Sequence, residues 1–483
     1  MRRWIAVVAL MASGGASAQT FYVATNGVDA PAGGTLVAPW ATITYALDRV
    51  ADGSTILVRP GTYTGRVRIR GSFANGVTVR SEVPYQARLR AAETVLTIYN
   101  DAADIQGISI EGFDIAHTGA GATALVVQIQ DGFSTDTRRI TLRDNILHDS
   151  FNNDILKINN GASEIRVIGN MFYNQQGSDE HIDINSVDDV IVDGNVFFNN
   201  FVASGRPVPT DTSSYVVVKD SNGNDDGVVG ARNVILRRNV FLNWEGSIGS
   251  GFILFGEDGT ANFEAFNCLV ENNLLIGNSA VTMRSPLGVK GSRDITFRHN
   301  TVIGNLPANA YATRINREGS NPPIEAIRFV HNVFADTSGS MGDFSDTLPA
   351  DLSTTRPSTL ERNAYWNNGA ALPNDPTDVL NIDNDKGRIE DNPEVVTIGT
   401  VATPHWVPAN NNFNGGFTRI NDAFVSLVST YARIGATSSL IDAATPGSDV
   451  PATDILGTPR PIGADIGAFE FVLLPTIFAN GFE

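Results

Sequence analysis

The sequence predicts an all-β protein built as a solenoid of stacked rungs, and three observations support this fold class. A short motif beginning with asparagine recurs eight times, at steps of 25 to 44 residues, and a short alternating strand such as Ile140–Arg143 precedes each copy. Glycine is frequent, at 46 of 483 residues, which suits strands joined by tight turns. A β-patterned repeat of this length predicts parallel strands stacked about 4.8 Å apart. The repeated residues are Asn145, Asn170, Asn195, Asn239, Asn273, Asn300, Asn332 and Asn363.

We expect each repeated asparagine to lie at a tight turn between two strands. Asparagine tolerates left-handed backbone better than most residues do. Its side-chain amide can also bond to the asparagine of the rung above and below, which forms a ladder. Phe113 takes the equivalent position one rung before Asn145.

Segments on both sides of the repeats are expected to cover the solenoid, whose open ends would otherwise expose unpaired backbone groups. Residues 19–66 are predicted to form an N-terminal cap, residues 67–370 the repeats, and residues 371–472 irregular C-terminal covering loops and a cap. In the first cap, Ile43, Ala46, Leu47 and Val50 share one face of a short helix, and Thr42 is its N-cap. In the second, Asp442, Asp454 and Asp465 are expected to bond turns.

The first 18 residues have the pattern of a signal peptide. Arg2 and Arg3 precede a short apolar run, and Ala16–Ala18 is a small-residue cleavage pattern. We therefore expect an exported chain, secreted or at the cell surface, that begins near Gln19. No later stretch is long and apolar enough to be a transmembrane segment. Residues 473–483 are predicted to be a separate tail.

The formal net charge of −18 restricts the partners of this protein. It argues against nucleic acid and anionic membranes. It also disfavours an acidic polysaccharide, unless a local basic cleft or a bound cation reverses the field. A single cysteine, Cys268, excludes a disulfide framework, and we expect a monomer.

The segments Phe21–Val23, Ala38–Ile43 and Gly53–Tyr63 resemble the opening of secreted right-handed parallel β-helix proteins of the pectate lyase-like superfamily. This group includes chondroitinase B-like and alginate lyase-like proteins, and the resemblance extends over residues 20–370. Residues 435–472 resemble a choice-of-anchor segment of exported bacterial proteins. The resemblance implies a right-handed parallel β-helix that acts on an extracellular or cell-wall polysaccharide, without selecting one chemistry.

Aligning the strands that follow the long turn of each rung predicts two outward-facing columns. One contains Lys157, Asp183, Val217, Thr282 and Arg314, and the other contains Asn159, Asn185, Lys219, Arg284 and Asn316. Lys157, Lys219, Arg284 and Arg314 would then form a basic groove on an acidic protein. The alternative is a set of scattered solvated side chains, because a register error of one residue would destroy the alignment.

A group of carboxylates on adjacent rungs is a candidate metal site. Asp154, Asp179, Glu180 and Asp183 could form an oxygen cage, and Ca²⁺ is the ion that such ligands suit. The alternative is that these residues only form turns.

Together these features favour a lyase that cleaves a uronate-containing glycan by β-elimination. Ca²⁺ or an arginine such as Arg284 neutralises the substrate carboxylate, so that the neighbouring proton becomes acidic. Lys219 is the first candidate for the base, because Lys157 and Arg284 are expected to lower its pKa. His181 is the alternative base. The predicted substrate contacts are Lys157, Arg314, Asn185 and Trp244.

Three other functions remain open, because no complete lyase motif is present. The same proton abstraction could give a C5-epimerase. Glu180 with Asp183 or Asp154 could serve as the two acids of a glycoside hydrolase. The same face could also belong to a non-enzymatic surface or adhesion protein that binds glycans.

Overall fold

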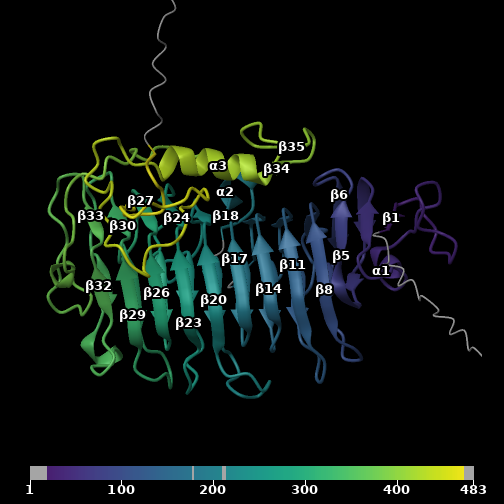
Figure 1. Cartoon of the computed structure of the whole chain (residues 1–483), viewed down its shortest axis with the longest axis horizontal. Helices are drawn as coiled ribbons and strands as arrows, with labels where there is room; N and C mark the ends of the chain where they lie inside the picture. The colour runs from purple at the N-terminus through teal and green to yellow at the C-terminus, as the bar shows by residue number, and fades with distance from the viewer. Residues whose placement is uncertain (1–18, 177–178, 209–213, 473–483) are drawn as a thin grey trace, which may run out of the picture.

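The computed structural model describes residues 19–176, 179–208 and 214–472, and most of them wind into one long parallel β-helix (Figure 1). The predicted signal peptide, residues 1–18, and the predicted tail, residues 473–483, lie outside the described residues. The fold is a right-handed parallel β-helix, as predicted: three parallel sheets run its length, and each rung adds one strand to each sheet.

Sheet A contains β1 (Thr20–Val23), β2 (Thr55–Val58), β5 (Ser72–Ser81), β8 (Ile105–Glu111), β11 (Thr137–Arg143), β14 (Ser163–Ile168), β17 (Asp188–Asp193), β20 (Ala231–Arg237), β23 (Ala265–Glu271), β26 (Arg293–Arg298), β29 (Glu325–Val330) and β32 (Thr359–Glu361). Sheet B contains β3 (Gly61–Thr64), β6 (Ala87–Ala91), β9 (Asp114–His117), β12 (Ile146–His148), β15 (Met171–Tyr173), β18 (Val196–Phe198), β21 (Val240–Phe241), β24 (Leu274–Gly277), β27 (Thr301–Gly304), β30 (Val333–Ala335) and β33 (Ala364–Trp366). Sheet C contains β4 (Val67–Ile69), β7 (Leu96–Ile98), β10 (Val127–Gln130), β13 (Leu156–Asn159), β16 (Ile182–Asn185), β19 (Val216–Lys219), β22 (Ile253–Phe255), β25 (Leu287–Lys290), β28 (Thr313–Asn316) and β31 (Ser345–Thr347).

The core lies inside the coil, where apolar side chains from all three sheets stack from rung to rung. Phe172, Phe197 and Phe241 form one such stack on sheet B, with ring centroids 5.0 and 4.8 Å apart. Alternate residues of each strand face inward, which is why strands such as Leu156–Asn159 alternate between buried and half-buried positions. The remaining side chains of sheet C point outward, although on β16 and β19 these are buried as well.

The predicted asparagine ladder is confirmed. The Nδ2 group of Asn145 donates to Oδ1 of Asn170 at 3.1 Å, and the same bond repeats along the helix until Asn363 donates to Asp385. At the other end, the backbone N–H of Phe113 donates to Asn145 Oδ1. The asparagines of the ladder are fully buried, so their amides are satisfied by one another and by backbone carbonyls.

The left-handed backbone that we expected at these asparagines lies instead at the residue before each of them. Asp144 has a φ of 53°, Arg238 of 52° and His299 of 50°. The preceding residue makes the turn, because the asparagine must direct its amide inward to reach its neighbours.

The N-terminal helix α1 (Ile43–Leu47) is present as predicted. Thr42 caps it by accepting a hydrogen bond from Tyr45 N at 3.2 Å, and Ile43, Ala46 and Leu47 are buried. Strands of sheets A and B already begin within residues 19–66.

The C-terminal segment contains more regular structure than predicted. It carries the 3₁₀ turn η2 (Ile382–Asn384), the hairpin β34 (Trp406–Val407) and β35 (Asn412–Phe413), and the helix α3 (Ile420–Tyr431). In Figure 1 α3 lies over β18, β24 and β27 rather than at the end of the solenoid. Ile420, Phe424, Leu427 and Val428 are buried there in one cluster with outward-facing residues of sheet B. This segment therefore covers sheet B. Two further short helices are α2 (Phe201–Ser204) and η1 (Pro349–Asp351).

Among the described residues, no helix is both long and apolar enough to cross a membrane.

Candidate functional site

The predicted register of sheet C is correct for its central strands. Lys157 pairs with Asp183, which pairs with Val217. Likewise Asn159 pairs with Asn185, which pairs with Lys219. The parallel ladder therefore brings the outward residues of β13, β16 and β19 together, as the alternation of their sequences indicated.

Beyond β19 the predicted register is wrong for residues 281–284 and correct for Arg314 and Asn316, which continue the two columns on β28. The strand of the later rung is β25 (Leu287–Lys290) and not residues 281–284, so Lys290 takes the column position assigned to Arg284. Residues 281–284 lie in the preceding corner, where Met283 is buried and bridges to Ala308. Their alternation imitates a strand because Met283 is a core residue.

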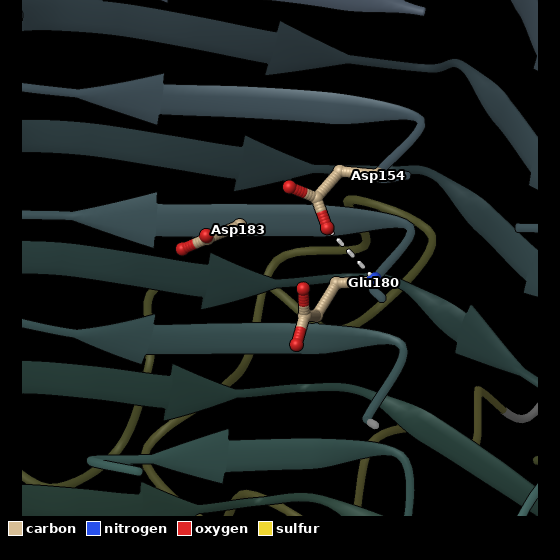
Figure 2. A group of neighbouring side chains, drawn as sticks. All are labelled: Asp154, Glu180 and Asp183. Atoms are coloured by element: carbon tan, nitrogen blue, oxygen red, sulfur yellow. Dashed lines mark hydrogen bonds between the residues drawn. The ribbon is translucent and has the colours of Figure 1, made fainter. Parts of the chain in front are cut away.

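Asp154, Glu180 and Asp183 form a compact carboxylate triad (Figure 2). One oxygen of each lies within 4.8 Å of the others, and the three residues are at most 4% exposed. Asp154 and Glu180 each lie two residues before a sheet C strand, so stacking of β13 on β16 places one above the other. Asp154 Oδ1 accepts the backbone N–H of Glu180 at 2.9 Å. Asp183 Oδ1 is buried and has no hydrogen-bond partner.

Asp179, the fourth predicted ligand, is not a member of this triad. It is half-buried and lies before Glu180 in the irregular corner that leads to β16. The i and i+4 spacing of Asp179 and Asp183 spans a corner and a strand, so the alternation of a single strand does not place both on one face.

Two lysines flank the triad. Lys157 contacts Asp183 Oδ2, and its ammonium nitrogen lies 3.9 Å from Asp154 Oδ2. The Lys219 ammonium nitrogen lies 4.0 Å from Asp183 Oδ2 and 3.6 Å from Asp258 Oδ2, and it also contacts Glu257.

The mutual repulsion of the carboxylates and their burial govern the protonation of the triad. Burial, followed by the charge of Asp154, raises the pKa of Glu180 well above its ordinary value. Burial also raises the pKa of Asp183, although Lys157 and Lys219 oppose this effect. Burial and mutual repulsion therefore make negative charge on the triad costly, and Lys157 and Lys219 offset only part of this cost.

The expected lowering of the Lys219 pKa is wrong. Burial does lower it, but the charges of Asp183, Glu180 and Glu257 outweigh burial and raise the pKa of this lysine. Carboxylates surround Lys219, whereas Arg284 lies further along the helix. In this structure Lys219 is a stable ammonium group.

Arg284 lies beside Arg314, not beside Lys219. Both guanidinium groups bond to Asp346 Oδ2, with Arg314 Nε at 3.0 Å, and Arg284 Nε is buried without a partner. Lys290 pairs with Glu318 nearby. A small depression of about 70 Å³ opens between Arg284, Lys290 and Arg314.

The predicted basic groove is therefore wrong as a continuous feature. Each of its cations, Lys157, Lys219, Arg284 and Arg314, contacts a carboxylate. The face alternates in sign, with the triad at its centre and the two arginines several rungs away.

Three other predicted site residues are held by contacts within the protein. His181 is fully buried, stacks on Tyr215 with ring centroids 4.2 Å apart, and has its pKa lowered by burial to about 3. Trp244 is 1% exposed within the corner between sheets B and C, so it cannot stack on a sugar. Asn185 accepts the backbone N–H of Ser221 at 3.2 Å and holds the loop after β19.

The residues that our sequence interpretation missed are acidic partners from later rungs. Glu257 and Asp258 follow β22 directly and reach Lys219, and Asp346 on β31 reaches both arginines. The strand Ile253–Phe255 was the available signal, because pairing Phe255 with Val218 places Gly256, the residue directly before Glu257, opposite Lys219.

The triad fits a divalent cation such as Ca²⁺. Three carboxylates are hard oxygen donors, and the unpartnered Asp183 Oδ1 is an acceptor that a cation would satisfy. Calcium takes about six to eight oxygens, so water or substrate must supply the remaining ligands. Lys157 would compete with a metal ion for the triad, because its ammonium group already contacts Asp183.

Comparison with known proteins identifies the fold. No protein-family model matches the sequence, and a search of curated proteins finds no match. The complex structure of XylC with xylose is similar, with a TM-score of 0.52 and 12% identity over 94% of this chain and 98% of that chain. Pectate lyase Pel9A aligns with a TM-score of 0.47 and 13% identity over 95% and 97%. A rhamnogalacturonan lyase aligns with a TM-score of 0.42 and 15% identity over 71% and 87%. At such identities, the likeness to XylC establishes the β-helix fold alone.

Proposed function

We propose that this chain is a carbohydrate-active protein that acts on a uronate-containing glycan, with the outward face of sheet C as its site. The observation that carries this proposal is the buried carboxylate triad flanked by Lys157 and Lys219. Buried, perturbed ionisable groups of opposite sign are typical of functional sites. The similar structure of XylC holds xylose, which supports a sugar as the class of ligand.

The reaction that we propose is β-elimination. A divalent cation at the triad would supply the positive charge that makes the proton beside a uronate carboxylate acidic. Lys157 binds the substrate carboxylate and stabilises the negative charge that develops on it. Lys219 is the proposed proton acceptor. It is an ammonium group in the free protein, so substrate binding must replace its contacts with Asp183 and Glu257, and the amine must release its proton to water before it accepts the proton beside the uronate carboxylate. The bond from the uronate to the leaving sugar oxygen then breaks, and that oxygen takes a proton from water. Arg284 and Arg314 hold a second acidic group further along the face.

Hydrolysis is the second candidate, and the raised pKa of Glu180 favours it. A carboxyl group whose pKa burial raises can serve as a general acid, while a neighbouring carboxyl group such as Asp183 assists. C5-epimerisation would use the same proton abstraction as the lyase, and a binding protein would use the same face without chemistry.

One assay separates these functions. The purified protein is incubated with polygalacturonate, alginate and glucuronoxylan, with Ca²⁺ and then with chelator. Unsaturated product ends that absorb ultraviolet light indicate the lyase, and reducing ends without that absorbance indicate the hydrolase. Inverted C5 centres in the NMR spectrum indicate the epimerase, and retention without product indicates the binder.

The matched variants are Asp183→Asn in the triad and Asp225→Asn, which removes an exposed loop carboxylate of the same kind. We expect the first to abolish activity and the second to retain it. Equal activity of the two variants would reject the triad as the site.

We also propose that the chain is exported by residues 1–18, as their sequence pattern predicts. The N-terminal sequence of the protein recovered outside the cells should then begin near Gln19. Full-length protein confined to the cytoplasm would reject export.

A further inference from the structure

Between the triad and the N-terminal end of sheet C, two rungs present an uncharged surface. Their outward residues are Thr97 and Tyr99 on and after β7, and Gln128 and Gln130 on β10. These four residues, together with Phe133 of the turn that follows β10 and Asn159 of β13, are called the neutral strip. Arg68 precedes Thr97 in the register and Lys157 follows Gln128, so charged rungs bound the strip on both sides.

An exposed aromatic ring stands at the edge of the neutral strip. Phe133 is 98% exposed, which is unusual for so large an apolar side chain. Asp101 fixes the turn by accepting the backbone N–H of Phe133 at 3.1 Å and the hydroxyl of Tyr99. The ring is therefore presented on a turn tied to the preceding rung.

The neutral strip also contains polar atoms that lack protein partners. Thr97 Oγ1 and Asn159 Oδ1 are both buried and make no hydrogen bond. Such atoms are costly unless water or a ligand satisfies them. Gln128 and Gln130 bond to each other at 2.6 Å and keep further donors and acceptors.

We propose that the neutral strip is a subsite for uncharged sugar residues of the glycan. Amide and hydroxyl groups bond sugar hydroxyls, and an exposed aromatic ring packs on the apolar face of a sugar ring. The Asp101 carboxylate at the edge disfavours a second uronate at this position. Two rungs span roughly 10 Å, which is room for a short run of sugars.

This subsite would select the sugar composition of the substrate. The inference rests on the proposed function, because the triad defines where the uronate lies. Lys157 follows Gln128 by one rung, so a glycan running along the solenoid places neutral sugars directly next to its uronate. The substrate is then a mixed polymer of neutral and acidic sugars and not a homopolymer of uronate.

The test is a calorimetric comparison of three ligands of equal length: a rhamnogalacturonan oligosaccharide, in which neutral sugars and uronates alternate along the chain, a neutral xylo-oligosaccharide and an oligogalacturonate. We expect the full-length protein to bind the alternating ligand roughly tenfold more tightly than the oligogalacturonate, the effect of one good aromatic contact. Phe133→Ala and Thr97→Val should remove most of this difference and leave oligogalacturonate binding unchanged.

Ile462→Ala is the matched control, because Ile462 is 87% exposed on the C-terminal segment and far from the neutral strip in sequence. Identical ligand binding by Phe133→Ala and Ile462→Ala would overturn the subsite, as would equal affinity for the mixed and uronate ligands. Failure of the proposed function looks different: no acidic ligand binds, and Asp183→Asn changes nothing. Phe133-dependent binding of the neutral ligand would in that case still support the strip as a sugar site.

Discussion

The ammonium nitrogen of Lys219 lies 4.0 Å from Asp183 Oδ2, although the two residues occupy neighbouring strands and different outward columns. Asp183 is paired in register with Val217, so Lys219 reaches it diagonally across the face of sheet C. This contact joins the carboxylate triad to the lysine that we propose as the proton acceptor.

The triad should respond to calcium in the unfolding equilibrium. Ca²⁺ should raise the melting temperature of the wild-type protein and a chelator should reverse this, because an ion that binds only the folded state adds about 2.7 kcal/mol at a hundredfold excess over its Kd. Calorimetry measures the shift. Asp183→Asn should lose the response while Asp225→Asn keeps it, and an unchanged response in Asp183→Asn would exclude the triad as the cation site.

Lys219→Met should destabilise the fold by about 3 kcal/mol, because it leaves Asp183, Glu257 and Asp258 close together without their shared cation. Urea denaturation measures the free energy of unfolding. The control is Lys290→Met, whose partner Glu318 is about half exposed, and we expect a loss below about 1 kcal/mol there. Similar losses in both variants would contradict the buried character of the Lys219 cluster.

Asn239→Ala should cost about 2–4 kcal/mol, because it leaves several buried groups of neighbouring rungs unpaired. Asn239 Oδ1 accepts bonds from the amide and backbone N–H of Asn195, and its own amide donates to the Val192 carbonyl. Asn305→Ala, at an exposed asparagine, is the control in the same denaturation experiment. A loss as small as that of Asn305→Ala would show that the ladder contributes little to stability.

Below neutral pH the contact between sheet B and the C-terminal segment should weaken. His331 Nδ1 lies 3.2 Å from His299 Nε2, and His331 also accepts the backbone N–H of Thr445. Burial and the nearby charge of Arg460 lower the pKa of both histidines, that of His331 to about 4. Both are then neutral in the folded state, whereas the unfolded chain protonates them near pH 6.5.

The direction of this pH dependence follows from proton binding. Between about pH 6.5 and 4 the unfolded state binds more protons than the folded state, so a lower pH favours unfolding. The contribution of this pair to stability is fully present above pH 6.5 and is lost as the pH falls toward 4. Unfolding free energies at several pH values measure the loss, and His299→Gln should reduce it. A pH dependence that is identical in this variant would assign the loss to other groups.

Helix α3 should be essential for covering sheet B. Phe424→Ala removes a buried ring from the interface and should cost about 3–5 kcal/mol, whereas Val425→Ala alters the neighbouring exposed position. Limited proteolysis should then cut the C-terminal segment of Phe424→Ala faster than that of Val425→Ala. Equal cleavage rates would mean that α3 is held by other contacts.

The sequence predicted the site as far as the register of sheet C could be followed. Lys157, Asp183 and Lys219 come together because β13, β16 and β19 alternate plainly and stack without an offset. The prediction failed at Arg284, where a corner residue, Met283, is as buried as a strand residue and copies the alternation. It failed at Trp244 and His181, because corner side chains can point inward and local sequence does not reveal this.

The sequence by itself determined the solenoid. The repeat of Asn145 and its seven counterparts predicts where each rung turns and which strand residues face inward. Only the tertiary structure decided the charge of the site. The partners of Lys219 and Arg284 come from loops and strands of later rungs, at Glu257, Asp258 and Asp346, whose lengths and paths follow no repeat. A carboxylate acts through space and not along the chain, so the pKa of Lys219 could be established only once these neighbours were in place.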